Sequence, residues 1–176
     1  MKRASAPTAG SAAPRLGRSA LGERLSGFIY GTIVALSVVV AGVRAYPHGP
    51  GHVAALVAVT SVVFWIAHVY AHGLGHGVVS GEHLSLAELR RIARREGSIV
   101  EAAVPPVAAL VLGGIGVLSP AASAWLAFAL GLAVLAAQGL VFARIERLGV
   151  LSTALVVTAN LGLGLLLVAL KLVLSH

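Results

Sequence analysis

Five long apolar runs constrain the fold of this chain more than any other feature of its sequence. They lie at residues 27–45, 53–76, 99–118, 121–143 and 149–174, and short turns or charged segments separate them. Each run is about as long as a helix that crosses a hydrocarbon core roughly 30 Å thick. The sequence therefore predicts an all-α, polytopic membrane bundle of five transmembrane helices.

The composition indicates lipid rather than water as the main solvent of the chain. Of the 176 residues, 58% are hydrophobic and 11% are charged, and the mean hydropathy is +0.95. A water-soluble domain of this length cannot bury so much apolar surface. The chain contains no cysteine, which excludes disulfides, thiolate metal sites and a cysteine nucleophile.

The positions of the basic residues predict an orientation. If five spans alternate, eleven of the 13 Lys and Arg fall on one side: five in residues 1–24, four in residues 90–95 and two in residues 144–147. Only Arg44 and Lys171 fall on the other side. The positive-inside rule then places the amino terminus in the cytoplasm and the carboxyl terminus outside. Because this distribution follows the membrane spans, the net charge of +7 does not indicate a nucleic-acid partner.

Two further features concern the source and the amino-terminal end of the chain. The excess of Arg, Ala, Val, Leu and Gly is typical of a GC-rich bacterial genome, so we expect the plasma (inner) membrane of a bacterium. Residues 1–24 lack a hydrophobic period, and we predict that they form a disordered basic cytoplasmic tail, with the membrane domain at 25–176. A cleaved signal peptide ending at Ala45 would be longer than such peptides normally are.

The connection between the second and third runs has the pattern of a short amphipathic helix at about residues 85–97. Ser85 and Glu88 form a capping box, Leu84 and Leu89 are spaced for a hydrophobic staple, and Gly97 can end the helix. One face is apolar and the other is basic, which is typical of a helix on an anionic membrane surface. We therefore expect anionic lipid headgroups to bind the four arginines of this helix, Arg90, Arg91, Arg94 and Arg95.

Three histidines at intervals of four residues lie toward the cytoplasmic end of the second run: His68, His72 and His76. Successive members are about 40° apart around a helix, so the three side chains would form a ladder roughly 12 Å long. Ionisable groups at membrane depth are costly and usually face the interior of a bundle. Imidazole binds transition metals and also exchanges protons near neutral pH. The ladder is therefore the main candidate for a functional site.

Polar groups on the neighbouring runs complete the predicted site. Pro105 and Pro106 cannot donate backbone hydrogen bonds, so they should break the third span and free carbonyl groups beside Glu101. We predict a site for a divalent transition metal whose ligands are His72, His76 and Glu101. In this prediction His68 is an inner proton relay and Gln138, on the fourth run, is its polar neighbour.

Simpler interpretations of the same residues remain open. Ser98 and Glu101 are spaced as a capping box, which needs no ligand. The glycines that follow His72 disfavour helix, so the second helix could end there and leave His76 in a loop. His68 could form a hydrogen bond that only packs two helices together.

Small and polar residues predict helix contacts. Gly27-x-x-x-Gly31 and Gly73-x-x-x-Gly77 are patterns that allow two membrane helices to approach closely. Asn160, in the middle of the fifth run, is expected to form an interhelical hydrogen bond.

The predicted function is that of a transporter or channel for a proton or a small inorganic cation, using the His/Glu site. One alternative is a structural or assembly subunit of a membrane complex without chemistry of its own, and homo-oligomers are compatible with either. A second alternative is a membrane metalloenzyme with a His-liganded metal. Because no catalytic constellation is present, the sequence does not favour an enzyme.

Overall fold

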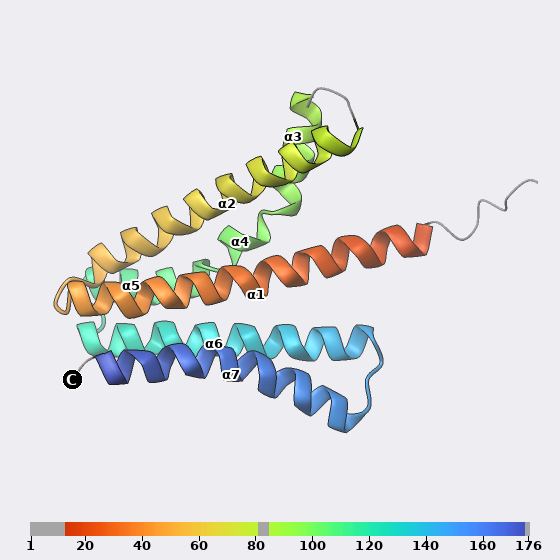
Figure 1. The fold of residues 1–176 in the computed structure, drawn as a ribbon. Coiled ribbons are helices and arrows are strands. Elements are labelled where there is room, and N and C mark those ends of the chain that lie inside the picture. Colours follow the sequence, from red (N-terminus) through yellow and green to blue (C-terminus); the bar gives the residue numbers. More distant parts are fainter. Residues whose placement is uncertain (1–12, 81–84, 175–176) are drawn as a thin grey trace, which may run out of the picture.

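The chain folds as a bundle of α helices (Figure 1), and the computed structural model describes residues 13–80 and 85–174. Every regular element of these residues is helical. In chain order the helices are α1 (Ala13–Ala45), α2 (Pro50–Ser80), α3 (Leu86–Arg95), α4 (Ser98–Glu101), α5 (Val104–Gly114), α6 (Pro120–Ile145) and α7 (Val150–Leu174).

Four helical segments are long and apolar enough to cross a membrane: Leu21–Ala45, Pro50–Gly75, Pro120–Ile145 and Val150–Leu167. A fifth candidate is a bent pair, in which Leu86–Glu101 and Val104–Gly114 meet at 50°. The structure confirms the predicted all-α bundle with several apolar helices capable of spanning a membrane.

Two helices extend further than the apolar runs. Helix α1 begins at Ala13, so residues 13–24 are helical, although we expected them in a disordered tail; residues 1–12 lie outside the described part of the chain. Ala, Leu, Arg and Glu in this segment favour helix, which continues from the apolar span at little cost. Helix α2 continues to Ser80, so the interpretation that it ends near His72 is wrong. Glycine costs roughly 1 kcal/mol per residue, which is too little to stop a long packed helix.

The third span, predicted as one run over residues 99–118, is two short helices. Helix α4 ends at Glu101 and α5 begins at Val104, so the break lies just before the two prolines, as their chemistry requires. Proline is tolerated in the first turn of a helix because the amide it lacks would have no partner there. Helix α5 ends at Gly114, and Gly116 has a φ of 81°, which reverses the chain before α6.

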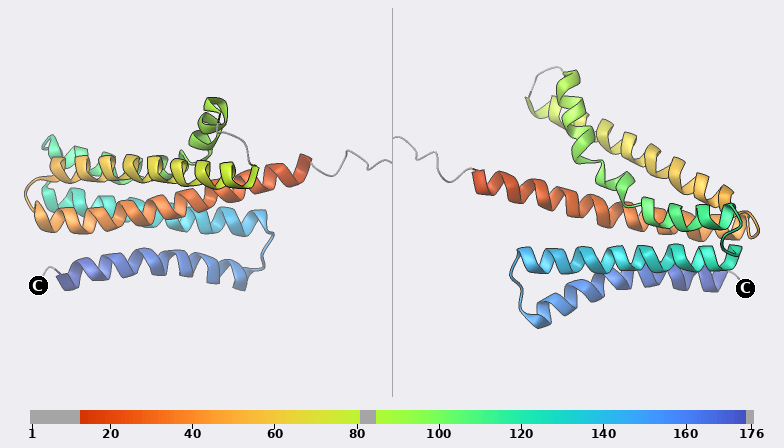
Figure 2. Two further views of the ribbon diagram at one scale, coloured as in Figure 1. Left: turned by 45° about the horizontal axis from the view of Figure 1, so that its top comes forward. Right: turned by 180° about the vertical axis from the view of Figure 1, so that it is seen from behind.

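The two longest helices are arranged as an open wedge. Helices α1 and α2 meet at the turn of residues 46–49 and diverge toward the opposite end (Figure 1). Helix α4 lies between the diverging helices, α5 lies where they converge, and α6 and α7 pack on the other side of α1 (Figure 2). We term the converging end the turn end, and the end with α3 and the α6–α7 link the charged end.

The placement of basic residues follows these two ends. Helix α3 carries four arginines, the α6–α7 link carries Arg147 next to Arg144, and the amino-terminal half of α1 carries Arg24; all three elements lie at the charged end (Figure 1). Arg44, in the last turn of α1, lies at the turn end. The described basic residues are therefore divided between the two ends of the fold as five alternating spans predict.

The core lies between α1, α2, α5 and α6 and is apolar. Its fully buried large side chains include Leu36, Val57, Leu110 and Phe128. On its outer side α7 is tied to α6 by Asn160, whose Nδ2 donates a hydrogen bond of 3.3 Å to the carbonyl oxygen of Leu135. This confirms the interhelical hydrogen bond expected for Asn160.

Helices α1 and α4 approach closely at the predicted pair of glycines. A Cβ atom added to Gly31 would lie 2.5 Å from the carbonyl oxygen of Ile99 and 2.8 Å from its Cα atom. A Cβ atom at Gly27 would collide with the side chain of Ser98. The small-residue pattern therefore admits α4 into the wedge, and this contact positions the residues of the candidate site.

Candidate functional site

The candidate site centres on a contact between His72 and Glu96. The Nδ1 atom of His72 lies 2.8 Å from Oε1 of Glu96, and the Glu96 side chain is only 15% exposed, against 60% for His72. A protonated imidazole forms a salt bridge at this distance, and a neutral one with hydrogen on Nδ1 donates a hydrogen bond. The carboxylate thus orients the ring in either protonation state.

Helix α3 brings Glu96 to this position. It begins at the predicted cap, where Ser85 Oγ accepts a 3.2 Å hydrogen bond from the amide of Glu88, and Glu96 is its C-cap residue. The indole Nε1 of Trp65 donates a 2.9 Å hydrogen bond to the carbonyl oxygen of Ala93, which fastens α3 to α2. The predicted staple involves Leu84, which lies outside the described residues.

Aromatic contacts extend the pair along α2 and across to α1. The rings of His72 and His68 meet edge to face with centroids 6.1 Å apart, and the His68 and Tyr30 centroids are 5.1 Å apart. Tyr30 also contacts Phe64, with centroids 6.1 Å apart. Glu96, His72, His68 and Tyr30 therefore form one continuous line of polar side chains across the wedge.

A pocket of about 460 Å³ lies beside this line at the charged end. Its lining comes from α1, α2, the C-cap of α3 and the start of α4: Gly22, Glu23, Ser26, Gly27, Tyr30, His68, His72, Glu96 and Ile99. Since one water occupies about 30 Å³ of liquid volume, the pocket has room for several waters. The ladder thus borders a space that solvent can fill.

Between Tyr30 and the turn end, the hydroxyl groups of the bundle do not extend the polar line, because they bond within their own helices. Thr32, Ser37 and Ser61 each donate a hydrogen bond to the carbonyl oxygen four residues earlier in the same helix. The apolar core fills the space between the helices there. The candidate site is therefore one-sided, with its polar groups at the charged end.

The predicted metal ligands have different partners in the structure. Oε2 of Glu101 accepts a 2.8 Å hydrogen bond from Nη2 of Arg24, while His72 pairs with Glu96. His76 lies within α2, but its side chain is outside the described part of the structure. Among the described residues, no three His, Asp or Glu side chains are grouped closely enough to hold a metal ion. The metal site stays a prediction.

The structure also tests the predicted capping box at Ser98 and shows where Gln138 lies. The capping box of Ser98 and Glu101 is wrong, because the N-cap of α4 is Gly97 and Ser98 Oγ is buried with no hydrogen-bond partner among the described residues. Gln138 is half-buried on α6 and is not part of the pocket lining described above.

The sequence-based prediction missed Glu96, although a signal for it exists. His72 lies eight residues before the end of α2 at Ser80, about 12 Å along the helix, and Glu96 lies ten residues after the start of α3 at Leu86, about 15 Å. Two helices joined by a short connection fold back on each other, so positions equally far from the connection become neighbours. Glu96 is the acidic residue at that distance.

Comparisons with protein-family models, with curated proteins and with solved structures found no match for this chain. The functional argument therefore depends on the geometry of the site.

Proposed function

We propose that this protein is a multi-pass membrane protein that takes up and releases protons through the line of Glu96, His72, His68 and Tyr30, as a proton channel or proton-coupled transporter. The observation that carries the proposal is the 2.8 Å contact between His72 and Glu96 at the mouth of a histidine ladder. An imidazole ring can accept a proton at one nitrogen and donate one from the other, and the Glu96 carboxylate lies within hydrogen-bonding distance of the first ring.

The geometry suits stepwise proton transfer. The contact of Nδ1 with Glu96 fixes the orientation of the His72 ring, so Nε2 is the atom that can pass a proton inward. The centroid distance of 6.1 Å between His72 and His68 is longer than a direct hydrogen bond requires, and a bridging water can connect the rings. The adjacent pocket supplies the room for that water.

A proton is favoured over a metal ion because of the number of ligands in contact. A bound transition metal needs three or four protein or water ligands at about 2 Å. The described residues offer one close pair, His72 with Glu96, followed by ring contacts at longer distance. A chain of pairwise contacts is the arrangement that proton transfer needs.

Net transport needs a second arrangement, because the apolar core separates the site from the turn end. The break at Ala102 and Ala103 is the position at which α3 and α4 can move as a unit relative to α5. Helix-terminal residues of this kind commonly absorb the dihedral changes of a hinge. We propose that the structure corresponds to the state in which the site is accessible from the charged end.

The membrane orientation is part of the same proposal. The charged end faces the cytoplasm of a bacterium across its inner membrane, with α3 on the anionic headgroups and the carboxyl terminus outside. The gathering of Arg24, Arg144, Arg147 and α3 at one end supports this orientation. Access from the charged end would then mean proton exchange with the cytoplasm.

Proton flux into liposomes tests the proposal. The purified protein is reconstituted with a trapped pH-sensitive dye, and a potassium gradient with valinomycin drives proton entry. We expect His72→Gln and Glu96→Gln to lower the flux at least about tenfold, since removing a positioned acid–base group commonly costs that much or more. His52→Gln is the matched control, because His52 stacks on Tyr46 at the turn end, with centroids 5.5 Å apart.

Two results would overturn the proposal. One is a wild-type flux no greater than that of empty liposomes under either sign of potential. The other is a flux that His72→Gln and Glu96→Gln leave equal to that of His52→Gln, with all variants folded by circular dichroism.

A further inference from the structure

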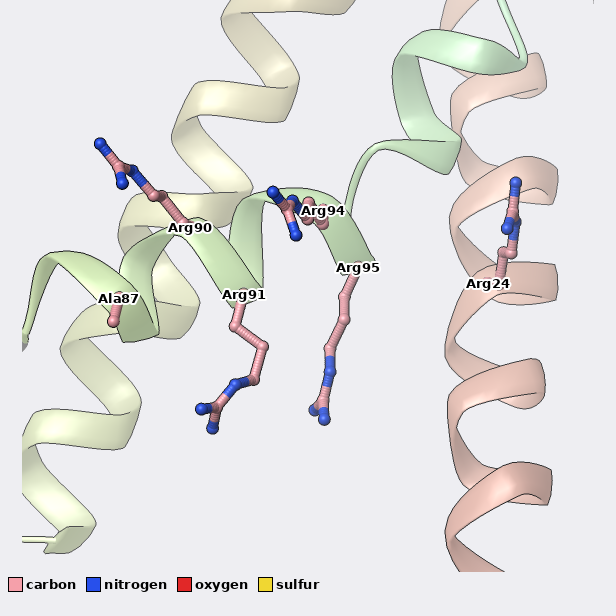
Figure 3. A pocket seen from close by; sticks show the side chains of 6 residues that line it. All are labelled: Arg24, Ala87, Arg90, Arg91, Arg94 and Arg95. Carbon is pink, nitrogen blue, oxygen red and sulfur yellow. The ribbon is translucent and has the colours of Figure 1, made fainter.

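A second pocket, of about 550 Å³, lies between α1 and α3 at the charged end. Its lining consists of Ala87 and five arginines: Arg24, Arg90, Arg91, Arg94 and Arg95. Figure 3 shows that Arg91 and Arg95 extend to the same side of α3, and that Arg24 lies across from them on α1. Residues more than 60 positions apart in the sequence therefore contribute to one basic site.

We infer that this arginine pocket is a binding site for the phosphate group of an anionic ligand. The inference goes beyond a general attraction of α3 to an anionic surface, because Arg24 belongs to α1 and completes the pocket from the opposite side. It also does not depend on proton transfer through the histidine ladder.

The charge in the pocket is incompletely neutralised. Arg24 pairs with Glu101 at 2.8 Å, and Nη1 of Arg95 lies 3.9 Å from Oε2 of Glu23. Within the described part of the chain, the three other arginines of the pocket have no such carboxylate partner. Five guanidinium groups line the pocket, and the two carboxylates that pair with them are Glu23 and Glu101. A phosphate group would supply the missing negative charge.

The side chains are also suited to phosphate in shape and position. The guanidinium group is planar and presents paired donors that match two phosphate oxygens, which gives arginine an advantage over lysine at such sites. Arg24 is positioned in advance by its ion pair with Glu101 and by its location 6.0 Å from the centroid of the Phe28 ring. The Arg24 and Arg95 side chains are more than half exposed, so a ligand can reach them.

The phosphate could belong to a phospholipid headgroup or to a soluble anion, and the surroundings are compatible with the lipid. No residue of α3 is buried, and Leu86 and Leu89, on its apolar face, are 69% and 40% exposed. A helix with such a face lies at the boundary between headgroups and acyl chains, where its arginines reach phosphate groups. Both sources place the same chemical group in the same pocket.

Binding measurements on the full chain in two arms distinguish the sources. In the first, inorganic phosphate and pyrophosphate are titrated into detergent-solubilised protein by calorimetry. In the second, native mass spectrometry counts lipids that remain bound to protein released from nanodiscs of phosphatidylcholine with and without phosphatidylglycerol. Binding in the first arm shows that a soluble anion can occupy the pocket without lipid. Selective retention of phosphatidylglycerol in the second arm shows that the lipid headgroup is the ligand.

Variants that remove positive charge inside or outside the pocket separate a built pocket from general attraction. We expect Arg24→Gln and Arg91→Gln each to weaken binding about fivefold, the contribution of one arginine near an anionic group. The double variant Arg144→Gln/Arg147→Gln removes two charges from the same end outside the pocket and should change binding less than about twofold, because salt screens charges beyond a Debye length.

The inference is overturned if neither phosphate nor phosphatidylglycerol binds. It is equally overturned if the Arg144→Gln/Arg147→Gln protein loses as much affinity as the Arg24→Gln protein. Helical content by circular dichroism shows that each variant has folded, and Arg91→Gln, at an exposed position, keeps the test decisive if Arg24→Gln is unstable.

Discussion

Replacement of Gly31 by alanine should destabilise the bundle, because α1 and α4 are too close at this position to admit a Cβ atom. The added Cβ atom would lie 2.5 Å from the carbonyl oxygen of Ile99, about 1 Å closer than an ordinary contact. The obstructing atoms are backbone, so no side-chain rotation can relieve the overlap, and α4 must move. Overpacking of this kind typically costs about 1–3 kcal/mol. We expect a steric cost of about 2 kcal/mol, which alone corresponds to roughly 30-fold in the ratio of folded to unfolded protein.

The matched control is Gly162→Ala on α7, where an added Cβ atom would meet nothing within 4 Å. Both substitutions gain the same helix propensity of roughly 1 kcal/mol, so the difference between them isolates the steric term. Thermal unfolding in detergent should give Gly31→Ala a midpoint about 4–8 °C below that of Gly162→Ala. If the two midpoints coincide, the close approach of α1 and α4 is not as described, and the position of Glu96 loses its support.

Two further predictions use the hydrogen bonds and the surface of the bundle. Asn160→Ala removes the bond to the carbonyl oxygen of Leu135 and should cost about 1 kcal/mol in the same unfolding assay, whereas a change below the error of the assay would show that the bond is not formed. Because the natural chain has no cysteine, single cysteines report orientation without background. In intact cells a membrane-impermeant maleimide should label Val117→Cys at the turn end and should leave Gly149→Cys at the charged end unlabelled until the cells are opened; the reverse pattern would invert the proposed topology.

Helix starts with a local capping signal were predictable, whereas the full lengths of α1 and α2 were not. Ser119 caps α6, with its Oγ accepting a hydrogen bond from the amide of Ala122, and Pro120 occupies the first turn; a serine followed by a proline is a recognisable helix start in the sequence alone. Hydropathy shows where lipid ends but not where a helix stops. Residues 13–24 continue as helix because Ala, Leu, Arg and Glu favour it, and α2 continues after Gly75 because the low helix propensity of a few residues costs too little to end a long packed helix.

The prolines predicted the break in the third span but not its consequence for Glu101. A missing amide indicates where a helix is interrupted, and the interruption lies at Ala102 and Ala103. Packing against the glycine face of α1 sets the direction in which the chain leaves the break. This contact joins residues that are distant in sequence, so local sequence patterns do not predict it. As a result, Glu101 pairs with Arg24 on α1, while His72 on α2 pairs with Glu96.

The sequence did not identify Glu96 as the partner of His72, because the length of α2 and the direction of α3 both had to be known. Glu96 has the appearance of a solvated residue at the end of an amphipathic helix, where acidic side chains are ordinary. Its proximity to His72 follows only once α2 is known to continue to Ser80 and α3 is known to fold back along it. The contact between His68 and His72 was predictable, since spacing by four places side chains on one helix face.

The divergence of α1 from α2 also has a consequence for the surrounding membrane. Helix α7 likewise separates from α6 toward the charged end, so the bundle has a larger cross-section at that end than at the turn end (Figure 1). A tapered inclusion relieves packing stress where one leaflet is stretched relative to the other. We therefore expect this protein to favour membrane regions in which the monolayer around its broader end is convex.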